Sequence, residues 1–141
     1  EPFTSGGRIN RAATRQITTS IMQEFDVRAP GPDVTARTLS GGNQQKLIIA
    51  REMYRDPDVL LAIQPTRGLD VGAIEFVHRQ IINARDTGKA VLVLSFDLDE
   101  VLDLSDRLVV LYGGRIVGNY RIGEISRTEL GLLMGGRGIH E

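Results

Sequence analysis

The chain has 141 residues, of which 41% are hydrophobic and 25% charged, and its formal net charge is −1 at pH 7. This is the composition of an ordinary soluble globular protein with room for one domain and a real core. The balanced charge gives no basic excess to drive binding to nucleic acid or to a membrane surface. The absence of cysteine excludes disulfides and thiolate metal sites, and two distant histidines, His78 and His140, make no metal cluster.

The first part of the chain is predicted to be an irregular lead over residues 1–7 and an amphipathic helix over residues 8–25. Apolar residues recur every four positions along that helix and form one stripe, which needs a partner surface: Ile9, Ala13, Ile17, Ile21 and Phe25. A connector over residues 27–38 follows, whose prolines and glycine are incompatible with a continuous helix. No apolar run approaches the length of a membrane span and no signal peptide is evident, so we expect a cytosolic chain.

The stretch Leu39-Ser40-Gly41-Gly42-Asn43-Gln44-Gln45-Lys46 leads into an apolar, helix-periodic run that should end near residues 55–57, before a proline. Two glycines at the start of a helix favour an anion site. The backbone can approach a ligand closely there, and the first N–H groups and the helix dipole both attract negative charge. The hydroxyl of Ser40 can donate to a phosphate oxygen. A bare Ser-Gly-Gly would more simply be an N-cap and a turn, but eight residues are more specific.

The second half of the chain alternates strands and helices. Residues 59–63 and 90–94 are wholly apolar, which predicts two parallel strands covered on both faces. Asp70 is the expected N-cap of a helix over residues 72–87, with Gly88 as its terminator. The inward positions of this helix are expected to be Ile74, Val77, Ile81 and Ile82.

Shorter elements follow: a helix over residues 98–104, a strand over 108–112, a tight turn at 113–114, a strand over 116–120 and a last helix ending at 135–136. Ser126 and Glu129 form a capping box at the start of that last helix. The order strand, helix, strand, helix, strand predicts an α/β fold.

The motif Leu-Ser-Gly-Gly-x-Gln-x-Lys before a helix resembles the signature motif of ATP-binding-cassette (ABC) ATPases. Two further motifs occur in the order of that family. Residues 64–70, Gln-Pro-Thr-Arg-Gly-Leu-Asp, resemble the end of the Walker B strand and the D-loop, and residues 95–97, Ser-Phe-Asp, resemble the switch region. The resemblance runs from about Arg8 to Gly136, and several motifs in register are much harder to obtain by chance than one.

The resemblance implies a partial P-loop NTPase fold, the C-terminal part of a cassette. Residues 1–56 would be a remnant of the helical subdomain, residues 57–136 the C-terminal part of the ATPase core with its hairpin and last helix, and residues 137–141 a tail. The sequence contains no Gly-x-x-x-x-Gly-Lys-Ser/Thr, so the parallel sheet would lack the Walker A strand and the nest that holds the β and γ phosphates. We expect the chain alone to bind ATP poorly and, with unpaired strand edges, to self-associate.

Three positions that resemble the family's catalytic half-site hold different chemistry. Ile63 stands where the family usually has the aspartate that holds Mg²⁺ through water, which an alkyl group cannot do. Gln64 replaces the glutamate that polarises the attacking water, and an amide has no basicity to accept its proton. Phe96 replaces the switch histidine, and simple apolar packing accounts for it and for Ile63. The resemblance implies no intact catalytic residue and no metal site, so the chain alone should be inactive.

The signature, in contrast, is intact. ABC cassettes pair head to tail, so each nucleotide lies between the Walker A of one cassette and the signature of the other. The resemblance therefore implies that Ser40, Gly41 and Gly42 contact ATP phosphate in trans, with Gln44 in support and Asp70 in the D-loop. ATP and Mg²⁺ would be cofactors of the full-length protein, with none bound tightly to this chain.

The sequence of residues 64–73 most resembles the second cassette of tandem-cassette importers for simple sugars and nucleosides. The implied partners are the intact first cassette of the same subunit, transmembrane permease subunits and a solute-binding protein, with no nucleic acid. The implied location is the cytoplasmic face of the cell membrane, as a peripheral subunit. The transported solute would contact the binding protein and the membrane subunits, so the sequence of this chain does not indicate which solute it is.

Two alternatives stay open. A non-transport ABC ATPase acting on ribosomes or DNA would be expected to carry basic patches, which the balanced charge does not indicate. A structural or regulatory pseudo-cassette with no nucleotide role would have no use for the Ser40 hydroxyl. The flanking full-length sequence, with or without an intact cassette upstream, would distinguish these possibilities.

Overall fold

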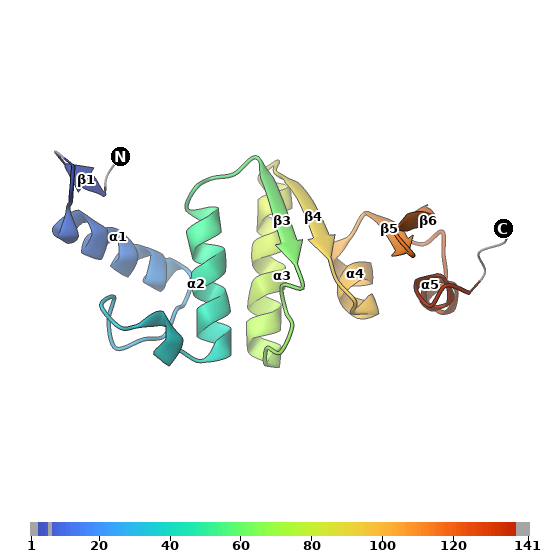
Figure 1. Ribbon diagram of the computed structural model, residues 1–141, viewed down its shortest axis with the longest axis horizontal. Helices are drawn as coiled ribbons and strands as arrows, with labels where there is room; N and C mark the ends of the chain where they lie inside the picture. Colours follow the sequence, from blue (N-terminus) through green and yellow to red (C-terminus); the bar gives the residue numbers. More distant parts are fainter. Residues whose placement is uncertain (1–2, 6, 138–141) are drawn as a thin grey trace. The chain divides into compact units, whose positions relative to one another are not determined.

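The computed structural model describes residues 3–5 and 7–137, so most of the predicted tail, including His140, lies outside the described residues. The chain divides into two compact units, one of Glu1–Leu60 with Pro65–Ala90 and one of Leu61–Gln64 with Val91–Glu141. Figure 1 labels the helices and strands in chain order. The predicted domain boundary between residues 56 and 57 stays a prediction.

The N-terminal segment differs from the sequence prediction. β1 (Thr4–Ser5) pairs antiparallel with β2 (Arg8–Ile9), where we expected an irregular lead and the first turn of a helix. α1 (Arg11–Glu24) begins only after Asn10, because the Asn10 side chain accepts a hydrogen bond from the backbone N–H of Ala13 at 3.1 Å and caps the helix there. The predicted helix start at residue 8 is therefore wrong.

Two capped helices build the core of the first unit. α2 (Gly41–Met53) begins at Ser40 and α3 (Val71–Asp86) begins at Asp70, whose Oδ1 accepts from the N–H of Ala73 at 2.9 Å, and both starts confirm the prediction. Gly88 has a φ of +88°, as a terminator of α3 requires. α2 and α3 pack against each other (Figure 1). The buried apolar residues of this unit are Phe25, Val27, Ala50, Ala73, Phe76, Val77, Ile81 and Ala84.

β3 (Val59–Ile63) and β4 (Ala90–Leu94) form a two-stranded parallel sheet (Figure 1). The strands confirm the prediction in type and extent, but the expectation that both faces are buried is wrong. Leu61, Ile63 and Leu92 are 57%, 60% and 61% exposed, because side chains alternate between faces along a strand and one face of this sheet is uncovered in the described chain.

The second unit confirms most of its predicted elements. α4 (Leu98–Leu104) is followed by β5 (Arg107–Tyr112) and β6 (Arg115–Arg121), which pair antiparallel through the expected two-glycine turn. Positive φ at both glycines, +54° and +76°, gives that turn the twist of a hairpin. α5 (Arg127–Met134) carries the predicted capping box and packs on β5, so that Leu108, Val110 and Leu130 form a small core.

Candidate functional site

The N-terminus of α2 presents hydrogen-bond donors, and its own first turn carries no negative charge. Ser40 is exposed, and its Oγ accepts hydrogen bonds from the backbone N–H of Asn43 at 3.4 Å and from Asn43 Nδ2 at 3.0 Å. By helix geometry the N–H groups of Gly41 and Gly42 have no acceptor within the helix, and the first turn contains no acidic residue. A Cβ at Gly41 would meet nothing within 4 Å, so a ligand can approach its backbone. These features fit an anion such as a phosphate group.

Gly42 brings the signature next to Asp70. A Cβ at Gly42 would lie 3.2 Å from the Cβ of Ala73 and 3.6 Å from Asp70 Oδ2. The first of these distances is tighter than ordinary contact, so a glycine lets the starts of α2 and α3 approach closely. The structure thus brings together two segments that the sequence separates by almost thirty residues, while the role predicted for Asp70 toward a nucleotide stays a prediction.

Two glutamines hold the segment in place. Gln44 Nε2 donates to the carbonyl oxygen of Leu39 at 2.8 Å, which supports the turn that leads into Ser40. Gln45 Nε2 donates to the carbonyl oxygen of Pro65 at 2.8 Å and ties α2 to the segment that follows β3. Sequence reasoning missed the contact of Gln45, since no local signal pairs a helix amide with a carbonyl twenty residues away.

Lys46 anchors the connector that follows α1. Its Nζ lies 2.6 Å from Asp26 Oδ2 and 3.0 Å from the Asp26 carbonyl oxygen, and it sits 4.9 Å from the centre of the Phe76 ring. Phe76 also meets Phe25 edge to face, with ring centres 6.3 Å apart. A cation over an aromatic face is attracted by the ring quadrupole. Lys46 therefore has a structural role that the resemblance did not indicate.

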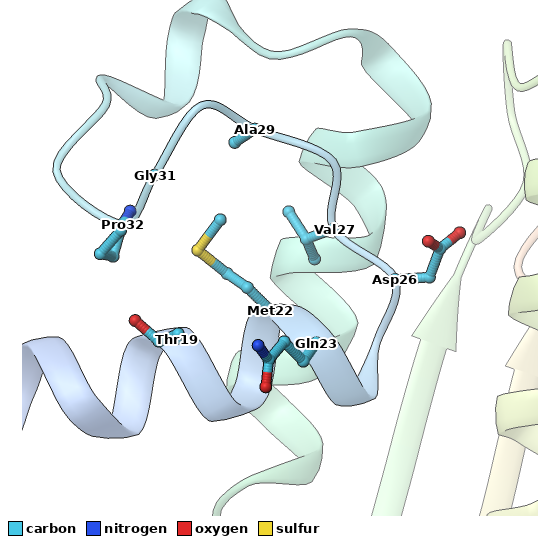
Figure 2. Close-up of a pocket in the computed structure, with 8 residues that line it drawn as sticks. All are labelled: Thr19, Met22, Gln23, Asp26, Val27, Ala29, Gly31 and Pro32. Atoms are coloured by element: carbon cyan, nitrogen blue, oxygen red, sulfur yellow. The ribbon is translucent and has the colours of Figure 1, made fainter.

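A cavity of about 290 Å³ lies between α1 and this connector (Figure 2). Its lining residues are Thr19, Met22, Gln23, Asp26, Val27, Ala29, Gly31 and Pro32. Figure 2 shows Met22 and Val27 pointing into the space between the two segments. The one acid in the lining, Asp26, is already paired with Lys46, so the cavity offers apolar contact and no acid or base ready for catalysis.

Ile63, Gln64 and Phe96, the three positions that resemble the family's catalytic half-site, carry no carboxylate or imidazole. Ile63 is 60% and Phe96 is 78% exposed, so the expectation that both are packed in an apolar core is wrong for the described chain. Gln64 has a φ of +48°, and its backbone N–H donates to the carbonyl oxygen of Leu94 at 2.8 Å. Its Nε2 is buried without a hydrogen-bond partner among the described residues. None of these three side chains carries a negative charge or has the basicity to accept a proton from water.

Within residues 3–5 and 7–137, no three acidic, histidine or cysteine side chains gather in a group that could hold a metal ion. The donors at the start of α2 fit phosphate oxygens but not Mg²⁺, which requires oxygen ligands. None of the helices in the described chain is long and apolar enough to cross a membrane.

Three exposed carboxylates have pKa values held low by hydrogen bonds. The Lys46 ammonium lowers the pKa of Asp26 below its ordinary value of 3.8, and the Arg127 guanidinium does the same to the pKa of Asp99. The hydroxyl and the backbone N–H of Ser126 lower the pKa of Glu129 below 4.5.

A carboxylate with a depressed folded-state pKa stabilises the fold above its unfolded pKa, and that stability is lost as pH falls through the folded pKa. We therefore expect the thermal unfolding midpoint of the chain to be level above about pH 5 and to fall steadily below about pH 4. Lys46→Met should remove the contribution of Asp26 and flatten part of this slope. An unfolding midpoint that rises on acidification, measured by circular dichroism, would contradict the assignment.

The chain has part of the fold of an ABC ATPase cassette. It matches the dimeric ATP-binding cassette MJ0796, in a post-hydrolysis state bound to ADP and phosphate, with a TM-score of 0.70 and 23% identity. That match covers 87% of this chain and 53% of that chain. The predicted fold class, part of a P-loop NTPase, is confirmed at this level. No protein-family model matches the chain.

Sequence relatives are ATP-binding proteins of importers. The chain is 52% identical over 136 residues to the guanosine import ATP-binding protein NupO of Bacillus subtilis, covering 96% of this chain and 27% of that protein. It is 58% identical over 121 residues to the nucleoside import ATP-binding protein NupA of Lactococcus lactis, covering 86% and 24%. A glucose import ATP-binding protein of Haloferax volcanii is 47% identical over 138 residues, covering 96% and 25%.

The chain thus spans about a quarter of the length of these relatives. Its homologues are ATP-binding subunits of nucleoside and sugar importers, as the resemblance implied at that level. The assignment to the second cassette of a tandem subunit stays a prediction.

Proposed function

We propose that the chain is part of the ATP-binding subunit of an ABC importer for nucleosides or simple sugars, and that the start of α2 serves an ATP held by a partner cassette. The observation that carries this proposal is the contrast between the donor-rich start of α2 and the positions that resemble the catalytic half-site. Ser40, Gly41 and Gly42 present donors to solvent at a helix N-terminus, whereas Ile63 and Gln64 offer no carboxylate.

These residues would act by charge stabilisation. When bound in trans, ATP supplies a γ-phosphoryl group whose oxygens carry negative charge through the reaction. The Ser40 hydroxyl and the N–H groups of Gly41 and Gly42 would bind and orient those oxygens, and Gln44 would hold the preceding turn. Donors fixed by a helix cap need little reorganisation during the reaction, which makes such contacts effective.

The chain's own half-site would not hydrolyse ATP. Gln64 can orient water but cannot accept its proton, and Ile63 cannot hold the water shell of Mg²⁺. The proposed partners are an intact first cassette of the same subunit, membrane permease subunits and a solute-binding protein. The proposed location is the cytoplasmic face of the membrane. We also propose that the isolated chain self-associates.

We expect the purified chain to hydrolyse no ATP above background, because it has neither the phosphate-binding loop nor a catalytic carboxylate. The measurement is phosphate release with saturating Mg²⁺ and millimolar ATP, with heat-treated chain as the background. Mg²⁺-dependent turnover that disappears on changing Ser40 would show that the chain hydrolyses ATP alone and would overturn the proposal.

A further inference from the structure

Asn43 joins the signature to the connector after α1. Its Oδ1 accepts a hydrogen bond from the backbone N–H of Arg28 at 2.7 Å. Because a backbone N–H only donates, the amide oxygen must face Arg28 and the amide Nδ2 must face Ser40. The connector is held on its other side by the pair of Lys46 and Asp26, two residues before Arg28, so the orientation of the Asn43 amide is fixed from outside α2.

This orientation sets the direction of the Ser40 hydroxyl. Its Oγ accepts from Asn43 Nδ2 at 3.0 Å and, more weakly, from the Asn43 backbone N–H at 3.4 Å. A hydroxyl oxygen has two lone pairs, and both are used by these donors. Its proton is therefore the part left to form a further hydrogen bond, and it is free to donate to an acceptor outside the helix.

The same chain contains the opposite arrangement. At the start of α5, Ser126 occupies the cap position of Ser40, and Glu129 occupies the position of Asn43, three residues later. There the Ser126 hydroxyl donates to Glu129 Oε2 at 2.6 Å, so its proton is consumed within the cap. The residue three positions after a capping serine thus decides whether the serine hydroxyl donates within the cap or can donate to an outside acceptor.

We propose that Asn43 is the positioning residue that makes the Ser40 hydroxyl an outward donor to phosphate, an inference that rests on the proposed function of the signature. An amide at this position presents N–H to Oγ and releases the proton. A carboxylate would accept the proton, as Glu129 does, and would leave Ser40 Oγ with only its lone pairs to present to a phosphate oxygen.

The test uses Asn43→Asp in the full-length protein, since aspartate has the shape of asparagine. One carboxylate oxygen still accepts from the Arg28 N–H, and negative charge in the first turn of a helix is favourable, so the unfolding midpoint should not fall. ATP turnover should fall by about tenfold to a hundredfold, the usual effect of losing a hydrogen bond to a charged group. A crystal structure of the variant chain should show the contact from Ser40 Oγ shortened from 3.0 Å toward the 2.6 Å seen at Ser126.

A double-mutant cycle separates this effect from added charge. Ser40→Ala alone should lower turnover about tenfold or more, and Asn43→Asp should add less than about twofold in the Ser40→Ala background. Asn83→Asp, the same exchange on the exposed side of α3, is the matched control and should change turnover by less than about twofold.

The outcomes are distinct. If Ser40→Ala has no effect, the trans role of the signature is wrong, and the inference with it. If Ser40→Ala lowers turnover but Asn43→Asp does not, or lowers it equally in both backgrounds, the proposed function stands and the positioning role of Asn43 is overturned. A shared loss with Asn83→Asp would also overturn it.

Discussion

Ser40→Arg in the full-length protein should lower ATP turnover by about 10²-fold or more, the scale of removing an electrostatic contact to developing charge. The substitution removes the hydroxyl that caps α2 and places a long cation at an exposed position between Gly41 and the proposed nucleotide. A side chain of that size should also block closure of this cassette over its partner's ATP. Phosphate release and solute uptake should fall together.

Loss of a helix cap alone costs about 1 kcal/mol of stability, so the prediction needs a control for folding. Ser126→Arg provides it, because Ser126 caps α5 in the same chain with the same type of hydrogen bond. Ser126→Arg should lose at least as much stability as Ser40→Arg, since Ser126 also donates to Glu129, and only Ser40→Arg should lose turnover. Transport at the wild-type rate by Ser40→Arg would show that the signature does not serve a partner's nucleotide.

Local signals in the sequence predicted the elements well. The cap at Asp70, the capping box at Ser126 and the glycine turn after β5 depend on neighbouring residues, so they could be predicted from short stretches. The predicted helix start at residue 8 was wrong because the apolar periodicity continues on the N-terminal side of Asn10. The Asn10 side chain caps the start of α1 by a hydrogen bond that periodicity does not detect. Phe76 was missed as a core residue, although it is 8% exposed and lies beside the predicted Val77.

Contacts between distant segments could not be predicted. The sequence indicated Ser40, Gly41 and Gly42 through the motif, but the bonds of Asn43 to Arg28, Gln45 to Pro65 and Lys46 to Asp26 join residues 15 to 20 positions apart. These hydrogen bonds depend on how α2 packs against distant segments, and the periodicity of the sequence does not predict that packing. The same limit explains the strands: apolar runs predict a buried sheet, whereas burial depends on whether another layer covers each face.

The isolated chain should be a dimer or larger at micromolar concentration, associated through an interface other than the head-to-tail arrangement of intact cassettes. In the described chain β4 pairs only with β3, and β5 pairs only with β6, so both sheets keep strand edges with unpaired N–H and C=O groups. Such edges favour pairing with another chain. The exposed face of the first sheet adds apolar area, with Leu61 57%, Leu92 61% and Leu94 40% exposed.

A second copy can satisfy both features, either by edge pairing or by exchange of the hairpin of β5 and β6 together with α5. Light scattering should give a mass of at least twice that of the chain, and Leu92→Lys should shift it toward the monomer by placing a charge on the exposed face without disturbing a buried residue. Val71→Lys, the same kind of change at a 72% exposed residue at the start of α3, should leave the mass unchanged. A stable monomer at high concentration, with Ala90–Leu94 and Arg107–Tyr112 both protected from hydrogen exchange, would show that the chain satisfies its strand edges alone.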